Sequence, residues 1–292
     1  MTDQKKARWT ILEVLDWTRA HFQNKGLESP RLDAEVLIAH VLNLSRIMLY
    51  ARFDQPLAST ELVRIRELVA RRARHEPIAY LIGRREFFSL EMEVNRDVLV
   101  PRPDTELLVE VTLKALQSQA TPNVVDVGSG SGCIAIAVAA NHPGARVFGL
   151  ELSPAALVVA MRNAESRGVS DRVQFEESDL LAKLPPAAQP ADAVVANLPY
   201  IPSHELQDLM ADVRDHEPRL ALDGGPDGLA LIRRLIQTVP SVLRSSGFVA
   251  LEAAPSQIPL VAELLDAAGM TDVQSHTDLG GHLRVATARR AA

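Results

Sequence analysis

The feature that most restricts the fold of this chain is a glycine-rich stretch at residues 126–132, which reads Asp-Val-Gly-Ser-Gly-Ser-Gly. It follows an apolar run at 124–127 that is typical of a buried strand, and it precedes an Ala/Ile/Val-rich segment that predicts a helix. Glycines at such a turn let the backbone bend sharply and let a ligand approach without a Cβ in the way. The stretch therefore predicts a ligand-binding turn in an α/β domain.

Strands and helices continue to alternate after this turn. Further strands are predicted at 146–150, 173–175, 193–196, 247–251, near 273 and at 283–286. Alternation of this kind is typical of a mostly parallel sheet with helices on both faces. We therefore expect an α/β fold for this part of the chain.

The first 80 residues predict helices instead. Thr10 can cap a first helix, Ser29-Pro30 can open a second, and Ser59 or Thr60 a third. Between residues 83 and 100 the apolar pattern has a period of two, which predicts a hairpin with its turn at 95–97. We expect a helical recognition domain at 1–84, a hairpin linker at 85–100 and an α/β domain at 101–292.

Composition and charge exclude several classes of protein. The longest apolar run, 133–140, is too short to cross a membrane, and the first ten residues lack the pattern of a secretory signal. A single cysteine, Cys133, suits a reducing compartment and a small packing role, so we expect a cytoplasmic protein. Eight scattered histidines predict no metal site. Residues 1–85 hold 15 basic and 10 acidic side chains, whereas residues 86–292 hold 16 basic and 27 acidic ones. The acidic excess of the second part disfavours nucleic acid as a partner.

Glu151 limits the class of ligand that the glycine turn is predicted to bind. It ends the next strand, where a carboxylate can accept hydrogen bonds from both ribose hydroxyls of an adenosine ligand. A dinucleotide fold needs G-x-G-x-x-G, and the third glycine is replaced by Cys133 or Ala135, depending on where the motif starts. The G-x-G-x-G pattern after an acid instead resembles the first motif of class I S-adenosylmethionine methyltransferases. The predicted cofactor-binding residues are Asp126, Gly128, Ser129, Gly130, Ser131, Gly132, Glu151, Asp179, Leu180 and Asn197, with Asp179 at the adenine amino group and Leu180 against the ring.

A second motif, Asn197-Leu198-Pro199-Tyr200, follows the strand at 193–196. It resembles the N/D-P-P-Y/F motif of methyltransferases that act on amide or aromatic amine nitrogens, and also the motif of ribosomal-RNA adenine dimethyltransferases. The lone pair of such a nitrogen is delocalised, so it attacks a sulfonium methyl poorly. The side-chain oxygen of Asn197 and the carbonyl of Leu198 can each accept one substrate N–H, which aligns the nitrogen, and Tyr200 supplies a flat wall. Leu198 stands where the motif usually has proline.

Four longer blocks resemble the bacterial release factor glutamine methyltransferase family, also known as PrmC or HemK. They are residues 76–83, residues 98–106 with Pro-Arg-Pro-Asp-Thr-Glu, residues 126–133, and residues 217–229. The resemblance implies a Rossmann-like seven-stranded domain behind a small all-α domain and a hairpin. It implies methyl transfer from S-adenosylmethionine, leaving S-adenosylhomocysteine, to the glutamine of the G-G-Q tripeptide in class I release factors. It also implies that Asn197, Leu198, Pro199 and Tyr200 hold the glutamine, and that the segment 101–103 lines the site near the methionine end of the cofactor, with Arg102 as a further substrate-binding residue.

Two alternatives remain open besides a non-enzymatic binding module: an adenine methyltransferase of nucleic acid, and a glutamine methyltransferase of another protein. The second is left open by departures from the family pattern at Leu198, at 252–257 and at 281–284. The acidic residues Asp212, Asp215 and Glu217 are expected to form a solvated run.

Overall fold

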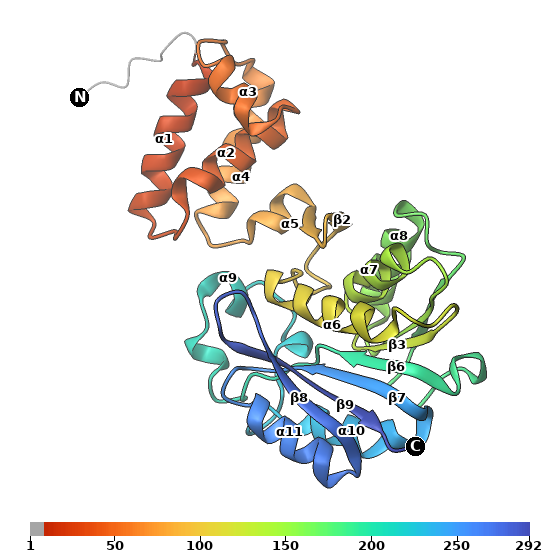
Figure 1. The fold of residues 1–292 in the computed structure, drawn as a ribbon. Helices are drawn as coiled ribbons and strands as arrows, with labels where there is room; N and C mark the ends of the chain where they lie inside the picture. Colours follow the sequence, from red (N-terminus) through yellow and green to blue (C-terminus); the bar gives the residue numbers. More distant parts are fainter. Residues whose placement is uncertain (1–8) are drawn as a thin grey trace. The chain divides into compact units, whose positions relative to one another are not determined.

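A computed structural model describes residues 9–292. These residues divide into two compact units (Figure 1). The first unit holds the chain up to Gly83 together with Met210–His216, and the second holds Arg84–Leu209 and Glu217–Ala292. Residues 1–8 lie outside the described residues. Most of the expectation that the N-terminus lacks the pattern of a secretory signal concerns these residues. No helix in residues 9–292 is long and apolar enough to cross a membrane.

The first unit is helical, and all three predicted helices are confirmed. Its helices are α1 (Ile11–Asn24), α2 (Pro30–Leu42), α3 (Arg46–Ala51), α4 (Ser59–Arg72), α5 (Ile78–Ile82) and α9 (Ala211–Arg214). Thr10 caps α1 by accepting the backbone N–H of Glu13, whose carboxylate in turn accepts the N–H of Thr10. The short helices α3, α5 and α9 were not predicted, because six residues or fewer carry no recognisable helical period.

A buried ion pair holds α9 within the first unit. The guanidinium of Arg72 donates to Asp33 at 2.7 Å and lies 2.8 Å from Asp212, whose other carboxylate oxygen lies 3.1 Å from His75 Nδ1. The expectation of a solvated acidic run holds for Asp215, which is exposed, but it is wrong for Asp212, which is half-buried in this ion pair, and for Glu217, which is buried. The spacing of acids along the sequence did not show that two of them meet arginines from distant segments.

The second unit begins with a hairpin of β1 (Arg84–Phe87) and β2 (Leu90–Glu93). Its turn is formed by Phe88 and Ser89, which have φ of +50° and +59°. The chain does turn at 95–97, where the N–H of Val98 donates to the carbonyl of Asn95, but the prediction that this turn joins the two strands of the hairpin and that 98–100 is a strand is wrong. Positive φ is uncommon for a phenylalanine, so the sequence did not mark this turn, and Glu106 helps to hold it by accepting the N–H of Phe88 at 2.8 Å.

A seven-stranded sheet forms the centre of the second unit and confirms the predicted α/β fold. Its strands are β3 (Asn123–Val127), β4 (Arg146–Glu151), β5 (Val173–Glu177), β6 (Ala191–Ala196), β7 (Leu243–Glu252), β8 (Met270–Thr277) and β9 (Leu283–Arg290). Their order is β5-β4-β3-β6-β7-β9-β8. The first five strands of this order are parallel, whereas β9 is antiparallel to both of its neighbours.

Helices cover both faces of the sheet (Figure 1). One face packs against α6 (Glu106–Leu116), α7 (Cys133–Asn141) and α8 (Pro154–Ser166), and the other against α10 (Ala230–Val242) and α11 (Ile258–Ala267). Val124 faces the first layer and Val125 the second, because successive side chains of a strand point to opposite faces. Short 3₁₀ turns lie at Pro103–Thr105, Pro186–Ala188, Leu206–Asp208 and Arg219–Ala221. The parallel strands end at one edge, where the predicted site residues leave the sheet.

Candidate active site

The glycine turn joins β3 to α7 with positive φ at all three of its glycines, and two of them also leave no room for a side chain. Gly128 and Gly132 have φ of +75° and +79°. A Cβ on Gly128 would lie 2.9 Å from the Cδ2 of Leu198, and one on Gly132 would lie 2.8 Å from the ring of Phe175. The backbone N–H groups of Gly128 and Ser129 donate to the carbonyl of Leu150, which fixes the turn against the end of β4. The glycines thus bring the β3 turn into van der Waals contact with residues 197–200, which are called the acceptor motif from here on.

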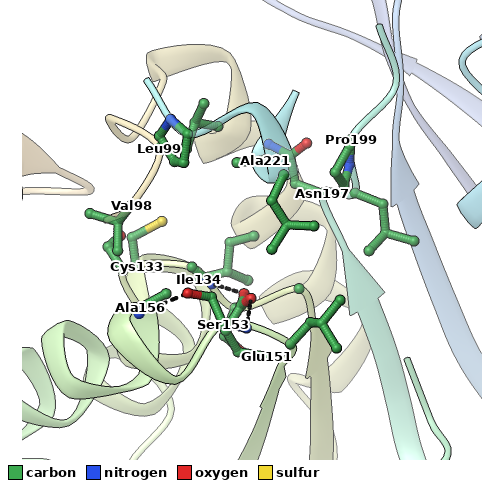
Figure 2. Close-up of a pocket in the computed structure, with 18 of the residues that line it drawn as sticks. Val98, Leu99, Cys133, Ile134, Glu151, Ser153, Ala156, Asn197, Pro199 and Ala221 are labelled. Carbon is green, nitrogen blue, oxygen red and sulfur yellow. Dashed lines mark hydrogen bonds between the residues drawn. The ribbon is translucent and has the colours of Figure 1, made fainter. Parts of the chain in front are cut away.

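Glu151 ends β4 and binds the backbone on both sides. Its Oε2 accepts the N–H of Gly130 at 2.9 Å, and its Oε1 accepts the N–H of Ser153 at 2.8 Å (Figure 2). Each carboxylate oxygen has a second acceptor site. The side chain therefore positions the glycine turn and can still accept two ligand hydroxyls.

Asp126 is fully buried and lies behind the turn. Its Oδ2 accepts the backbone N–H of Ala135 in the first turn of α7, at 3.2 Å. Burial raises the pKa of Asp126 to about 7, although the hydrogen bonds from Ala135 and Ser129 oppose the shift. Asp126 does not line the cavity described below; it holds the start of α7 in place.

Asp179 and Leu180 follow β5. Asp179 is exposed and pairs with Arg234 of α10 at 2.8 Å. Leu180 is half-buried, and its positive φ of +50° is held by a hydrogen bond from the hydroxyl of Ser178 to its carbonyl. Both residues lie on the wall of the cavity.

The acceptor motif leaves β6 with the Asn197 amide held in one orientation. Asn197 Nδ2 donates to the hydroxyl of Thr105 at 3.0 Å, and that hydroxyl donates to Glu252 Oε1 at 3.1 Å. Leu198 is 3% exposed because its side chain packs over Gly128. The carbonyl of Tyr200 accepts a hydrogen bond from Gln257 at 2.9 Å, and burial raises the pKa of its phenol to about 12.

Arg102 is fixed by Glu217. The guanidinium donates to Glu217 Oε1 at 2.6 Å, while Glu217 Oε2 accepts the backbone N–H of Val100 at 3.4 Å. The buried carboxylate thus holds the segment 100–102 at two points. Because of this pair, Arg102 is presented to the cavity in a defined position.

These segments enclose a cavity of about 270 Å³ (Figure 2). Eleven of the fourteen predicted site residues line it, whereas Asp126, Gly132 and Tyr200 do not. The residues of the wall that were not predicted are mostly apolar and include Val98, Leu99, Ile134, Leu152, Leu220 and Ala221. Cys133 also lines it, and burial raises the pKa of its thiol to about 12, which makes it a poor nucleophile. No cluster of three metal-binding side chains occurs in the part of the chain that the structure describes.

Sequence reasoning missed three polar residues that hold the predicted ones: Thr105, Glu217 and Glu252. Glu252 had a usable signal, because it ends β7 at the same edge of the sheet at which Glu151 ends β4. Thr105 and Glu217 had none beyond their place in the blocks that resemble the family.

The sheet order, the glycine turn and the acid at the end of β4 define a Rossmann-like methyltransferase. Solved structures with this fold include the hMettl16 catalytic domain (TM-score 0.59, 17% identity, 77% of this chain and 82% of that one). Another is the T. thermophilus 16S rRNA N2 G1207 methyltransferase RsmC (TM-score 0.51, 20% identity, 71% and 49%). At such identities the likeness shows the fold alone.

Sequence comparisons identify the family. The profile of the PrmC N-terminal domain matches residues 13–83, and that of a methyltransferase domain matches residues 124–216. Release factor glutamine methyltransferase of Geobacter sulfurreducens is 42% identical over 98% of this chain and 99% of its own length. That of Burkholderia pseudomallei is 45% identical over 88% and 91%. The chain belongs to the release factor glutamine methyltransferase family.

Proposed function

We propose that the chain transfers a methyl group from S-adenosylmethionine to the side-chain nitrogen of the glutamine in the G-G-Q tripeptide of bacterial class I release factors. The observation that carries the proposal is the orientation of Asn197. Its NH₂ group is engaged by Thr105, so its oxygen is the end available to a substrate in the cavity. An oxygen at that place accepts an N–H, which is what a glutamine amide offers.

The cavity residues fit S-adenosylmethionine. A Cβ at Gly128 would collide with Leu198, and one at Gly130 would point into open space, so the turn leaves room for a ligand at the backbone. Glu151 can accept the ribose hydroxyls, and the apolar side chains of Leu180 and Ile134 can cover the adenosine. The exposed carboxylate of Asp179 can receive the adenine amino group if it shares or leaves Arg234.

When bound, the cofactor supplies an electrophilic methyl group on a sulfonium sulfur. The residues of this chain orient the acceptor: Asn197 Oδ1 takes one N–H of the glutamine amide, and the carbonyl of Leu198 takes the other. Both dipoles also stabilise the positive charge that develops on the nitrogen. Transfer of the methyl group from sulfur to the glutamine nitrogen would leave the cofactor as its neutral thioether, and the alkylated nitrogen would release one proton to solvent. Because that proton becomes acidic on alkylation, no strong base is needed.

The first unit is proposed to recognise the release factor, with residues 1–84 as the recognition domain, 85–100 as linker and 101–292 as methyltransferase domain. The match of residues 13–83 to the PrmC N-terminal domain supports this division. A translation factor as substrate assigns the reaction to the cytoplasm, and the presence of one cysteine agrees with a reducing compartment.

The test is transfer of labelled methyl from S-adenosylmethionine to a purified class I release factor, beside the same factor with the G-G-Q glutamine replaced by alanine. We expect label on the unchanged factor only. Ribosomal RNA and other glutamine-bearing proteins form parallel arms. Label on RNA alone would overturn the proposal in favour of adenine methylation, and label on another protein would indicate a different target. Calorimetric binding of S-adenosylhomocysteine confirms in each case that the site is intact.

A further inference from the structure

A chain of two hydrogen bonds lies behind the acceptor motif. Asn197 at the end of β6 donates from Nδ2 to the Thr105 hydroxyl at 3.0 Å, and Thr105, just before α6, donates to Oε1 of Glu252 at the end of β7 at 3.1 Å. Thr105 and Glu252 are each only 2% exposed. Three segments far apart in the sequence therefore meet at a single buried hydroxyl.

The direction of these two hydrogen bonds follows from the negative charge on the carboxylate of Glu252. A carboxylate can only accept, so the single hydroxyl proton of Thr105 is committed to Glu252. The oxygen of Thr105 is then left as an acceptor, and the group on Asn197 that can satisfy it is the NH₂. The amide oxygen of Asn197 is thereby turned away from Thr105. If Glu252 were protonated, it could donate to Thr105, and Thr105 could donate to the oxygen of Asn197 instead.

We propose that Thr105 and Glu252 are positioning residues for methyl transfer, and that the ionised carboxylate of Glu252 fixes the Asn197 amide with its oxygen toward the acceptor nitrogen. The inference rests on the proposed function, because it assigns a role in that reaction. Protonation of Glu252 releases the amide, so that its NH₂ can face the acceptor N–H groups. The NH₂ of Asn197 and the N–H groups of the glutamine amide are both hydrogen-bond donors, so they repel each other and the glutamine nitrogen is no longer aligned for methyl transfer.

The surroundings of Glu252 bring this protonation within an accessible pH range. Burial raises its pKa to about 7 and Asp104 adds to the shift, while Thr105, Arg284 and the nearby Asn197 amide oppose it. The other titratable groups that face it are the thiol of Cys133 and the phenol of Tyr200, both neutral at pH 7 because burial raises each pKa to about 12. Arg284 is itself shared with Asp104 and Asp278, each at 2.9 Å. Within residues 9–292, Oε2 of Glu252 has no hydrogen-bond partner.

The first test compares Thr105→Val with Thr105→Ser in steady-state methylation of a class I release factor. Valine keeps the shape and removes the hydroxyl, so we expect kcat to fall about 10- to 100-fold. The dissociation constant of S-adenosylhomocysteine should stay within about twofold, because the hydrogen bonds that hold Glu151 and the glycine turn do not involve Thr105. Serine should restore most of the activity. Thr112→Val is the matched control, since Thr112 is a buried threonine of α6 whose hydroxyl binds only the helix carbonyl of Leu108. A Thr105→Val enzyme with wild-type kcat, or one no slower than Thr112→Val, would overturn the inference.

The second test is the pH dependence of kcat/KM. The wild type should lose activity as the pH falls through about 7, because Glu252 takes up a proton there. Glu252→Gln cannot titrate, so this acid limb should disappear in the variant. Persistence of the same limb in Glu252→Gln would overturn the inference and would assign the limb to another group, such as Asp126.

The third test needs no release factor and therefore separates this inference from the proposed function. The carboxyl carbon of Glu252 is followed by NMR in protein labelled with ¹³C-glutamate, with the signal assigned by its loss in Glu252→Gln. Thr105→Val should raise the pKa of Glu252, because the hydroxyl that stabilises the carboxylate is gone. An unmoved pKa would overturn the inference. A moved pKa in a protein whose wild type methylates no release factor would support the hydrogen-bond chain and refute the proposed function.

Discussion

Replacing Glu151 with alanine is expected to weaken cofactor binding by a calculable amount. Its two oxygens are held by the N–H groups of Gly130 and Ser153 at 2.9 and 2.8 Å, so the carboxylate is already in place before a ligand arrives. A hydrogen bond to a charged group contributes about 1.5–3 kcal/mol. Loss of one ribose contact therefore raises the dissociation constant about 10- to 150-fold. Gly130 and Ser153 are half-exposed, so water can replace the lost carboxylate and limit any further cost.

The assay is calorimetric titration with S-adenosylhomocysteine, which binds without turning over. Glu177→Ala is the matched control, because Glu177 ends β5 directly opposite Glu151 in the sheet register but is exposed and lies off the cavity wall. Glu151→Gln should bind no better than Glu151→Ala, since its NH₂ would face one of the two N–H donors. Thermal melts show whether each variant is folded. A folded Glu151→Ala protein with affinity within twofold of wild type, or an equal loss in Glu177→Ala, would refute the reasoning.

Three further predictions concern the turn and the acceptor motif. Asn197→Ala should lower kcat at least about 10-fold while leaving the S-adenosylhomocysteine affinity unchanged by calorimetry, and a collapse of affinity in a folded variant would contradict its role on the acceptor. Gly128→Ala should cost about 1–3 kcal/mol more than Gly130→Ala in urea unfolding without cofactor, because only the first meets Leu198; equal losses would contradict this packing. The folded protein holds the pKa of Asp126 at about 7, above its value in the unfolded chain, so the wild type loses stability as the pH rises from about 4 to 7. Asp126→Asn cannot lose this proton and should therefore remove part of that loss. Melting temperatures of both proteins at pH 5 and pH 8 test this prediction. We expect Asp126→Asn to be more stable than the wild type at pH 8, by up to about 4 kcal/mol, whereas a gain that is equal at both pH values would contradict the prediction.

Local patterns in the sequence were sufficient to predict the sheet and the groups that leave its edge. Glu151 and Asn197 directly follow short apolar runs, and a strand that ends at a polar residue delivers it to the carboxyl edge whatever the rest of the chain does. The capping of α1 by Thr10 was likewise readable, because the partner of the cap is three residues away.

The residues that hold the site depend on contacts that no local pattern encodes. Thr105 meets Glu252 across 147 residues, and Arg102 meets Glu217 across 115. For Glu217 the sequence predicted a solvated side chain rather than a buried one, because an acidic residue near other acidic residues is usually solvated. The position of the hairpin turn was predicted wrongly for a related reason. Phe88 adopts a positive φ that is unfavourable for its side chain, so tertiary contacts outweigh the local preference at this residue.

The place of α9 bears on how this protein can be recombined with its relatives. Residues 210–216 belong to the first unit through the Arg72–Asp212 pair, although the chain on either side of them belongs to the second. A chimaera that exchanges only residues 1–83 would leave Asp212 opposite a foreign helix and could strip a buried arginine of one of its two carboxylate partners. Two segments separated by 126 residues have to be exchanged together for the helical unit to be inherited whole.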